Sequence, residues 1–277
     1  MYSWCLEVGW HPLPFRKANL VAIPKPGNWD KSNPRSYRPL AILSVLGKGL
    51  ERLIVRRLAW VAIREKIIHP QHFGALPGRS ATDLTTAAVH DIEEALLCGR
   101  VTSILTLDIK GAFNAVLPGR LVCRLQQQGW SENLVRWVSY FATQRIARLR
   151  LDEETGPTFK VPSGIPQGSP ISPILFMLFM QPLFLLGSRD QKRACLSYAD
   201  DVALLTTSSS LEENNETLAK DFQEVTEWVQ HQGLAFDIGK TELMHFSWHR
   251  ACRNPPVQLN FQGTEVTVEP VRVRGAM

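Results

Sequence analysis

The segment LSYADDVALLTT at 196–207 places two short apolar runs on either side of a pair of aspartates. Short apolar runs joined by a polar pair are typical of a β-hairpin, so we predict a hairpin with Asp200 and Asp201 at its turn. An aspartate pair at a turn is by itself most often a solvated hairpin tip. A chemical role therefore needs further carboxylates nearby.

A third aspartate ends another strand-like run. VTSILTLDI at 101–109 is apolar and β-branched, which predicts a buried strand ending on Asp108. If this strand neighbours the hairpin in a sheet, the three carboxylates meet at one edge, where they repel unless a cation lies between them. Carboxylate oxygens suit Mg²⁺, and a pair of such ions is the usual apparatus of phosphoryl or nucleotidyl transfer.

The remaining hydrophobic spacing predicts a mixed fold. Strands are expected at 18–24 and 234–246, with a basic loop at 25–39 and a structured loop at 163–173. Helices are expected at 44–68, 80–99, 119–128, 131–141 and 174–186, and a further helix has Leu218, Phe222, Val225 and Val229 on one face and ends at 231–233. Because helices and strands alternate irregularly, we predict an α+β fold with a mainly antiparallel sheet rather than a doubly wound parallel one.

Composition and charge narrow the function. The 277 residues are 44% hydrophobic, with 31 Lys and Arg against 26 Asp and Glu, for a net charge of +5. This excludes a disordered, collagen-like or coiled-coil chain. Residues 1–80 hold 13 basic and 4 acidic side chains (net +9), which leaves 18 and 22 (net −4) for the rest. The pattern indicates a polyanionic partner on one part and carboxylate chemistry on the other.

The cysteines and apolar segments indicate the compartment. No CxxC pair occurs, which predicts reduced, buried thiols at Cys5, Cys98, Cys123, Cys195 and Cys252. The N-terminus has no signal-peptide pattern, and the most apolar stretch, 174–186, falls short of the ~20 residues of a membrane span. We expect a soluble intracellular protein without a membrane partner.

Six segments, in order, resemble one family. LTLDIKGAFNAV (105–116), SGIPQGSPISPILFMLFM (163–180) and LSYADDVALL (196–205) resemble the reverse transcriptase family, most closely its non-LTR retrotransposon branch. Three further segments resemble that branch: IPKPGNWDKSNPRSYRPLAILSVLGKGLERLI (23–54), HFGALPGRSATD (72–83) and GLAFDIGKTELMHF (233–246). The resemblance covers about residues 13 to 246, and the ordered set is far more specific than any single segment.

The resemblance implies a right-hand polymerase. A reverse transcriptase domain at 13–277 would have fingers at about 13–100 and 119–160 and a palm at about 101–118 and 161–277, with the thumb absent. It implies an RNA-directed DNA polymerase that adds dNTPs to a DNA primer 3′-OH on an RNA template. Two Mg²⁺ ions would serve the reaction, with Mn²⁺ as a substitute, and the oligomeric state stays open.

The resemblance also implies roles for individual residues. Asp108, Asp200 and Asp201 would bind the metals, the Ile109 carbonyl would add a ligand, and Lys240 would protonate the leaving pyrophosphate. Fingers and nucleotide roles fall on Lys25, Arg38, Gln167 and Gly168, and template or primer contacts on Arg79 and Tyr198.

Phe113 stands five residues after Asp108, where the family places a bulky side chain under the sugar of the nucleotide. Its ring would collide with a 2′-OH and so favour dNTPs over rNTPs. An ordinary core aromatic is the alternative reading.

Two departures leave alternatives open. Asn114 replaces the family's aspartate in AFD, and the chain stops about where a primer-grip turn is expected, which suggests a fragment or a decayed copy. The alternatives are a catalytically inactive nucleic-acid-binding remnant and an intron-encoded reverse transcriptase or maturase. We expect a nuclear location for a retrotransposon protein and a mitochondrial one for the intron alternative.

Overall fold

The computed structural model describes residues 1–27, 30, 32–151, 154–187, 192–248 and 254–271. The chain packs as two compact units. The first unit comprises Met1–Ile67 and Phe113–Phe179, and the second comprises Ile68–Ala112 and Met180–Met277. The fingers and palm boundaries implied by the resemblance are a functional division and stay a prediction.

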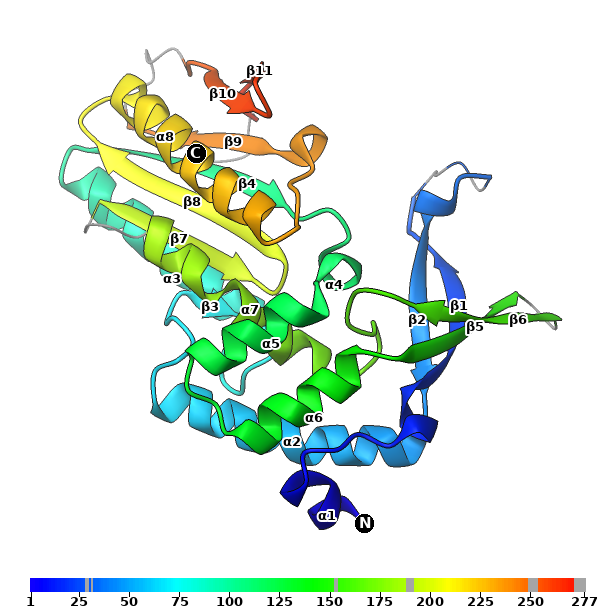
Figure 1. The fold of residues 1–277 in the computed structure, drawn as a ribbon. Helices are drawn as coiled ribbons and strands as arrows, with labels where there is room; N and C mark the ends of the chain where they lie inside the picture. The colour runs from blue at the N-terminus through cyan, green and yellow to red at the C-terminus, as the bar shows by residue number, and fades with distance from the viewer. Residues whose placement is uncertain (28–29, 31, 152–153, 188–191, 249–253, 272–277) are drawn as a thin grey trace. The chain divides into compact units, whose positions relative to one another are not determined.

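The first unit contains a four-stranded sheet in the order β2-β1-β5-β6, in which β1 and β5 are parallel and the other neighbours antiparallel (Figure 1). Its strands are β1 (Lys17–Pro24), β2 (Tyr37–Leu43), β5 (Arg145–Leu151) and β6 (Glu154–Val161). Its helices are α1 (Tyr2–Glu7), α2 (Val45–Arg64), α5 (Pro118–Gln127) and α6 (Glu132–Ala142), with 3₁₀ turns η1 (Leu13–Arg16) and η2 (Pro34–Ser36).

Helix α2 begins where the sequence predicts. The Ser44 side chain accepts a hydrogen bond from the Gly47 amide, satisfying one of the otherwise unpaired donors of the first turn. Of the apolar residues that predict this helix, Leu50 and Ile54 are buried, whereas Leu46 and Leu53 are exposed. The helix ends four residues before the predicted end, at Arg64.

The second unit contains a five-stranded sheet in the order β3-β7-β8-β4-β9. Among its described neighbours, β3 and β7 are parallel and the rest antiparallel, which confirms the predicted α+β fold with a mainly antiparallel sheet. Its strands are β3 (His72–Phe73), β4 (Val101–Asp108), β7 (Arg193–Tyr198), β8 (Asp201–Ser208) and β9 (Glu242–Phe246). A separate two-stranded sheet pairs β10 (Val257–Phe261) with β11 (Thr264–Val268).

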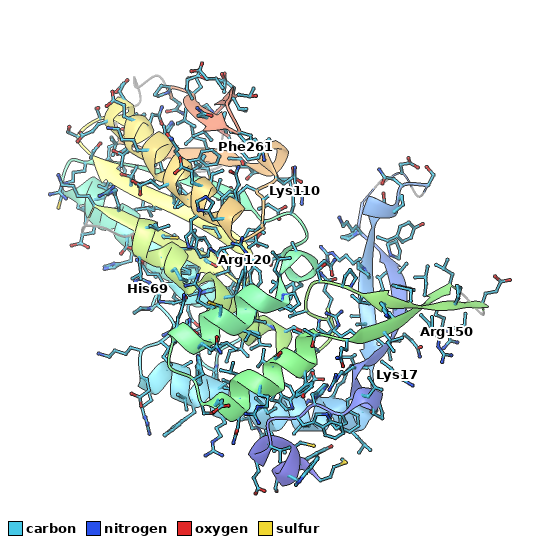
Figure 2. The ribbon with its side chains drawn as sticks, in the orientation of Figure 1. Lys17, His69, Lys110, Arg120, Arg150 and Phe261 are labelled. Carbon is cyan, nitrogen blue, oxygen red and sulfur yellow. The ribbon has the colours of Figure 1, made fainter. Side chains whose placement is uncertain are left out.

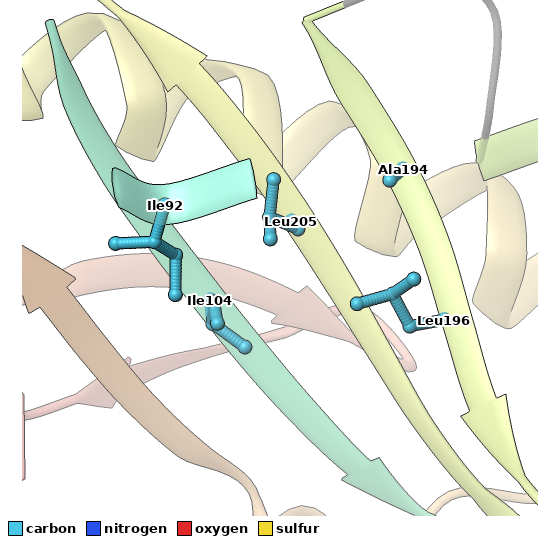
Figure 3. Packing of buried hydrophobic residues seen from close by; sticks show 5 residues of the cluster. All are labelled: Ile92, Ile104, Ala194, Leu196 and Leu205. Atoms are coloured by element: carbon cyan, nitrogen blue, oxygen red, sulfur yellow. The ribbon is translucent and has the colours of Figure 1, made fainter. Parts of the chain in front are cut away.

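Two helices cover opposite faces of the five-stranded sheet, α3 (Ala81–Leu97) and α8 (Leu211–His231) (Figure 1). Ser80 and Asp83 form a capping box at the start of α3. On the α3 face, one residue from the helix packs with four from three strands, as Figure 3 shows. These residues are Ile92, Ile104, Ala194, Leu196 and Leu205.

Two helices span the positions in the sequence where one unit ends and the other begins, which are Ala112/Phe113 and Phe179/Met180. Helix α4 (Ala112–Ala115) is a short turn after β4, and α7 (Ser172–Gly187) is the predicted apolar helix. The α7 side chains from Ile174 to Met180 are all buried, which agrees with the prediction of a core helix. In the described part of the chain, no helix has the length and apolar character needed to cross a membrane.

Some predicted boundaries are wrong. The loop predicted at 25–39 overlaps β2, which already begins at Tyr37 and tolerates Pro39 because β2 is an edge strand. The strand predicted at 234–246 begins only at Glu242, since residues Ile238–Lys240 form the 3₁₀ turn η3. Strands β5 and β6 were not predicted, although RIARLRL at 145–151 carries a readable alternation.

The cysteines partly depart from expectation. Cys5 and Cys195 are buried free thiols, as predicted. Cys98 and Cys123 are also free but exposed: Cys98 is the C-cap residue that ends α3, and Cys123 lies on α5, whose buried residues are Leu121 and Leu125. Cys252 lies outside the described residues.

Candidate active site

The three aspartates lie at one end of the five-stranded sheet. Strands β4 and β8 are antiparallel neighbours, and their register places Asp108 directly opposite Asp201. The hairpin turn consists of Ala199 and Asp200, and Tyr198 pairs with Asp201 to close it. The predicted juxtaposition of strand and hairpin is therefore confirmed, with one correction: Asp201 is the first residue of β8 and not part of the turn.

The three aspartates repel one another at this end of the sheet, and the repulsion changes the pKa of one of them. The pKa of Asp201 is raised, first by partial burial and then by the neighbouring charges of Asp200 and Asp108, while Lys240 acts in the opposite direction. A pocket of about 340 Å³ opens here, and its lining includes Asp108, Asp201, Tyr198 and Lys240. A larger pocket of about 680 Å³ in the first unit is mostly apolar and contains none of the predicted site residues.

Lys240 is the counter-ion of Asp108. Its ammonium lies 2.8 Å from the Oδ2 atom of Asp108, and this hydrogen bond is the main reason why the pKa of Lys240 is raised. The lysine reaches the site because η3 follows a bridge between Ile109 and Phe236. The hydrogen bonds flanking that bridge run from Asp237 N to Asp108 O (2.8 Å) and from Lys110 N to Ala235 O (2.8 Å), so neither uses the Ile109 carbonyl.

The donor set fits a hard divalent cation. Three carboxylates share one sheet edge, and two of them lie opposite each other in the ladder. Across the described residues, no three His, Cys, Asp or Glu side chains form a ready metal cluster, and Asp108 instead accepts from Lys240. The chemistry of the donors therefore suits Mg²⁺, whereas a preformed cage is not present in the described chain.

A second lysine lies near this edge. Lys110, labelled in Figure 2, follows β4, and its ammonium is 3.9 Å from the Oδ1 atom of Asp237. Both side chains are partly exposed, so the pair is weak. The sequence reasoning did not single out Lys110, although a lysine two residues after Asp108 is visible in the motif.

Backbone hydrogen bonds join the segment around Phe113 to the loop at 163–165 within the first unit. The Phe113 ring packs on Phe176 with 5.3 Å between ring centroids, and part of the side chain stays exposed. The Phe113 carbonyl accepts from the Ile165 amide (2.7 Å), and the Val116 carbonyl accepts from the Gly164 amide (2.8 Å). This pairing fixes the backbone that carries the Phe113 ring, and the predicted role of the ring in nucleotide selection stays a prediction.

Gln167 and Gly168 lie against strand β2 of the same unit. The Gln167 carbonyl accepts from the Ala41 amide at 2.7 Å. Gly168 has a φ of +106°, and a Cβ atom there would lie 2.7 Å from the Ala41 carbonyl oxygen. Only glycine permits this approach, which explains the residue type without assigning it a nucleotide.

Arg38 and Lys25 also belong to this region of the first unit. Arg38 is exposed on β2 and pairs in register with Ile23 of β1. The Lys25 amide donates to the Ser36 carbonyl (2.9 Å) just after β1. Their predicted contacts with a triphosphate stay predictions.

The two predicted template or primer residues lie in the second unit. Tyr198 is 38% exposed at the end of β7, so its ring is accessible. Arg79 is half-buried, and its Nη1 atom donates to the carbonyls of His69 (2.9 Å) and His72 (3.1 Å). The Nη1 atom of Arg79 is thus directed into the protein.

Glu51 is a buried carboxyl that the sequence reasoning missed. It lies on α2, is 0% exposed, and its Oε2 atom accepts from the Ser169 hydroxyl. The Ser169 hydroxyl oxygen also accepts from the Ile171 amide (3.3 Å). Within the described part of the chain, the Oε1 atom of Glu51 has no hydrogen-bond partner, and burial raises the pKa of this carboxyl to about 7.

We expect Glu51→Gln to stabilise the protein at alkaline pH. A raised folded-state pKa means that the contribution of Glu51 is full below its ordinary pKa of 4.5 and is lost as the pH rises through about 7. Glutamine stays neutral and still accepts from Ser169, so the stability of the variant relative to the wild type should rise by roughly 2–3 kcal/mol between about pH 5 and pH 8, on top of the pH-independent cost of burying the glutamine amide N–H groups. Thermal unfolding at both pH values measures it.

The exposed residue Glu154 of β6 offers the matched control for this substitution. Glu154→Gln should leave the melting temperature nearly unchanged at both pH values. An equal effect of Glu51→Gln at both pH values would contradict the assigned ionisation.

Comparison with known proteins places these features in a family. Residues 23–273 match the family described as Reverse transcriptase (RNA-dependent DNA polymerase). A probable RNA-directed DNA polymerase from transposon BS of Drosophila melanogaster is 28% identical over 246 residues, 87% of this chain and 27% of the relative. A Pol polyprotein from the type-1 retrotransposable element R1 of Bradysia coprophila is 27% identical over 96% of this chain and 26% of the relative. The chain thus spans about a quarter of the length of these relatives.

Solved structures share the fold. A telomerase of Candida tropicalis, truncated from its C-terminal domain, aligns with a TM-score of 0.63 at 13% identity, covering 96% of this chain and 57% of the other. Its likeness supports the α+β architecture. Because the family match spans residues 23–273, most of the chain, the chain belongs to the reverse transcriptase (RNA-dependent DNA polymerase) family.

Proposed function

We propose that this chain is the polymerase core of a non-LTR retrotransposon reverse transcriptase, which adds deoxynucleotides to a primer 3′-OH on an RNA template. The observation that carries the proposal is the placement of Asp108 opposite Asp201, with Asp200 in the adjoining turn. Membership of the reverse transcriptase family supports nucleotidyl transfer as the reaction at these three aspartates. Relatives named as RNA-directed DNA polymerases support an RNA template.

Residues of the second unit would carry the reacting centre. Asp108, Asp200 and Asp201 would hold two Mg²⁺ ions, with the Ile109 carbonyl as a further ligand. Bound divalent ions would supply the charge that neutralises a triphosphate and lowers the pKa of the primer hydroxyl. Lys240 is protonated at neutral pH like an ordinary lysine, and its hydrogen bond to Asp108 raises its pKa further, so it carries the proton that a donor to pyrophosphate needs.

Residues of the first unit would bind the nucleotide. The guanidinium of Arg38 and the ammonium of Lys25 would contact phosphate oxygens as a fork and a point charge. Gln167 and Gly168 would lie beside the nascent base pair, with the backbone already fixed by the Ala41 contacts. Phe113 would exclude the 2′-OH of a ribonucleotide.

Primer extension tests the proposal directly. Poly(rA) annealed to oligo(dT), with dTTP and Mg²⁺, should give extended primer with the 277-residue chain, and a chelator should abolish the product. Binding of the template and primer without extension in Mg²⁺ or Mn²⁺ would overturn the proposal in favour of a nucleic-acid-binding remnant.

Phe113→Ala should relax the selection of the sugar. Removing a ring that is held on Phe176 opens space for a 2′-OH, so the ratio of rUTP to dTTP incorporation should rise on the order of 10-fold or more. Phe159→Ala is the matched control, because Phe159 is 44% exposed on β6 of the same unit. An unchanged ratio in Phe113→Ala would remove the gate role.

Binding of the template should depend steeply on salt. The first 80 residues carry a net +9, and Lys17 and Arg150 mark basic positions on the four-stranded sheet in Figure 2. The affinity should fall at least about 10-fold between about 50 and 200 mM salt if phosphates dominate. Arg148 is exposed on β5 of this sheet, so Arg148→Gln should make the slope shallower. Arg136→Gln should not, since Arg136 pairs with Glu132 at 2.5 Å. Titration by fluorescence anisotropy measures both slopes, and a flat response would contradict the argument from charge.

A further inference from the structure

Arg79 holds together a loop that precedes α3. The Nη1 atom of Arg79 donates to the carbonyls of His69 (2.9 Å) and His72 (3.1 Å), and the Arg79 carbonyl accepts from the Gly74 amide (3.3 Å). The loop is also anchored to the core, because the buried His72 ring stacks on Phe184 with 4.6 Å between centroids. Figure 2 labels His69 at the start of this loop. One guanidinium therefore ties both ends of the segment 69–72.

The same loop contacts the turn that carries Asp200. Strand β3 runs parallel to the end of β7, with Phe73 opposite Tyr198. The Ser197 amide donates to the Gln71 carbonyl (3.1 Å), and the Ala199 amide donates to the Phe73 carbonyl (3.0 Å). These bonds reach the residue immediately before Asp200.

Ala199 needs such support. Its φ is +55°, a left-handed conformation that an alanine rarely adopts and that persists where neighbouring structure holds it. The loop approaches it closely, since a Cβ on Gly74 (φ +119°) would lie 3.1 Å from the Ala199 nitrogen. The hydrogen bond from Ala199 to Phe73 thus fixes a strained residue at the catalytic turn.

We propose that Arg79 is a positioning residue for the catalytic turn. Its hydrogen bonds to the His69 and His72 carbonyls hold strand β3 in place, and the Phe73 carbonyl of β3 in turn holds Ala199, the residue next to Asp200. This proposal rests on the proposed polymerase function and replaces a direct template contact as the main role of Arg79. The two N–H groups of a single guanidinium nitrogen, Nη1, serve both carbonyls, so one side chain fixes both ends of the segment.

Steady-state kinetics separate positioning from template binding. Arg79→Met should lower kcat for dTTP addition on the order of 10- to 100-fold, because a slightly misplaced reacting group costs this much. The Kd for poly(rA)·oligo(dT) and its salt slope should stay unchanged. Arg100→Met is the control, as Arg100 is exposed in the same unit, and it should change neither quantity. A several-fold weaker Kd with a slope shallower by about one and an unchanged kcat would overturn the proposal.

Hydrogen exchange gives a readout that does not need activity. In Arg79→Met the amides of Ser197 and Ala199 should exchange at least about 10-fold faster, while the β4 amides stay protected. Unchanged protection of Ala199 would overturn the proposal even if the wild-type chain extends no primer, so its failure is distinct from that of the polymerase function. If Arg79→Met does not fold, Gly74→Ala provides the second test: it should lower kcat and Ala199 protection with Arg79 intact, and normal values of both would count against the proposal.

Discussion

Asp200→Asn should abolish primer extension and leave the fold intact. The turn places Asp200 next to Asp201, which lies opposite Asp108, so the substitution removes one of three carboxylates from the shared edge. Asparagine keeps the shape and loses the charge. Because the charge is what a divalent ion and a developing phosphoryl charge respond to, we expect a loss on the order of 1000-fold or more in kcat.

The fold should tolerate this loss for an electrostatic reason. The charge of Asp200 helps to raise the pKa of Asp201, which means that the two carboxylates repel each other in the folded chain. Neutralising Asp200 relieves that repulsion, so the melting temperature near neutral pH should stay equal or rise slightly. A catalytic group that costs stability is expected where charges are gathered for a reaction.

The measurement is kcat for dTTP addition together with thermal unfolding of the same preparation. Glu265→Gln is the matched control, since Glu265 is an exposed carboxylate on β11 of the same unit. It should change neither quantity. Extension by Asp200→Asn at a tenth of the wild-type rate or faster would contradict the assignment of Asp200, and a large fall in melting temperature would contradict the electrostatic account.

Local signals in the sequence predicted much of the fold. The hairpin, strand β4 and helix α3 each carry a complete short-range pattern, and the capping box of Ser80 and Asp83 fixes where α3 begins. The opposition of Asp108 and Asp201 followed once the two strands were taken as neighbours. Their functional reading came from six ordered motifs, because an aspartate pair alone does not distinguish a site from a solvated turn.

Features that depend on distant partners could not be predicted in this way. Glu51 and Ser169 meet across 118 positions, and no local pattern around Glu51 indicates a buried carboxyl. Arg79 looks like any arginine at a helix start, and only the folded loop reveals its two carbonyl partners. Strand β2 was hidden because Pro39 argues against a strand until its edge position is known.

Gly164→Ala should be among the most destabilising single substitutions in the first unit. Gly164 is buried with a φ of +80°, and a Cβ atom there would lie 2.7 Å from both the Cα and the carbonyl oxygen of Asn114. Backbone atoms cannot move aside as a flexible side chain can. The left-handed conformation costs alanine roughly 1–2 kcal/mol, and the overlap should add about 2 kcal/mol more.

Two other glycines of the same unit separate these contributions. Gly129 has a φ of +76° but open space around its Cβ position, so Gly129→Ala should cost only the conformational part, about 1 kcal/mol. Gly119 lies in α5 with open space and an ordinary helical backbone, so Gly119→Ala should be neutral or stabilising by up to about 1 kcal/mol. Chemical denaturation of the three variants should therefore rank Gly119→Ala, Gly129→Ala and Gly164→Ala in order of increasing loss.

The consequence of Gly164→Ala should extend to nucleotide selection. The Gly164 and Ile165 amides donate to the carbonyls of Val116 and Phe113, so pushing residue 164 away from Asn114 must disturb the backbone that carries the Phe113 ring. We therefore expect the surviving folded protein to incorporate rUTP more readily than Gly129→Ala does. Equal stability of Gly164→Ala and Gly129→Ala would mean that the chain around Asn114 relaxes freely. In that case the close pairing of 163–165 with 113–116 could not be what fixes Phe113.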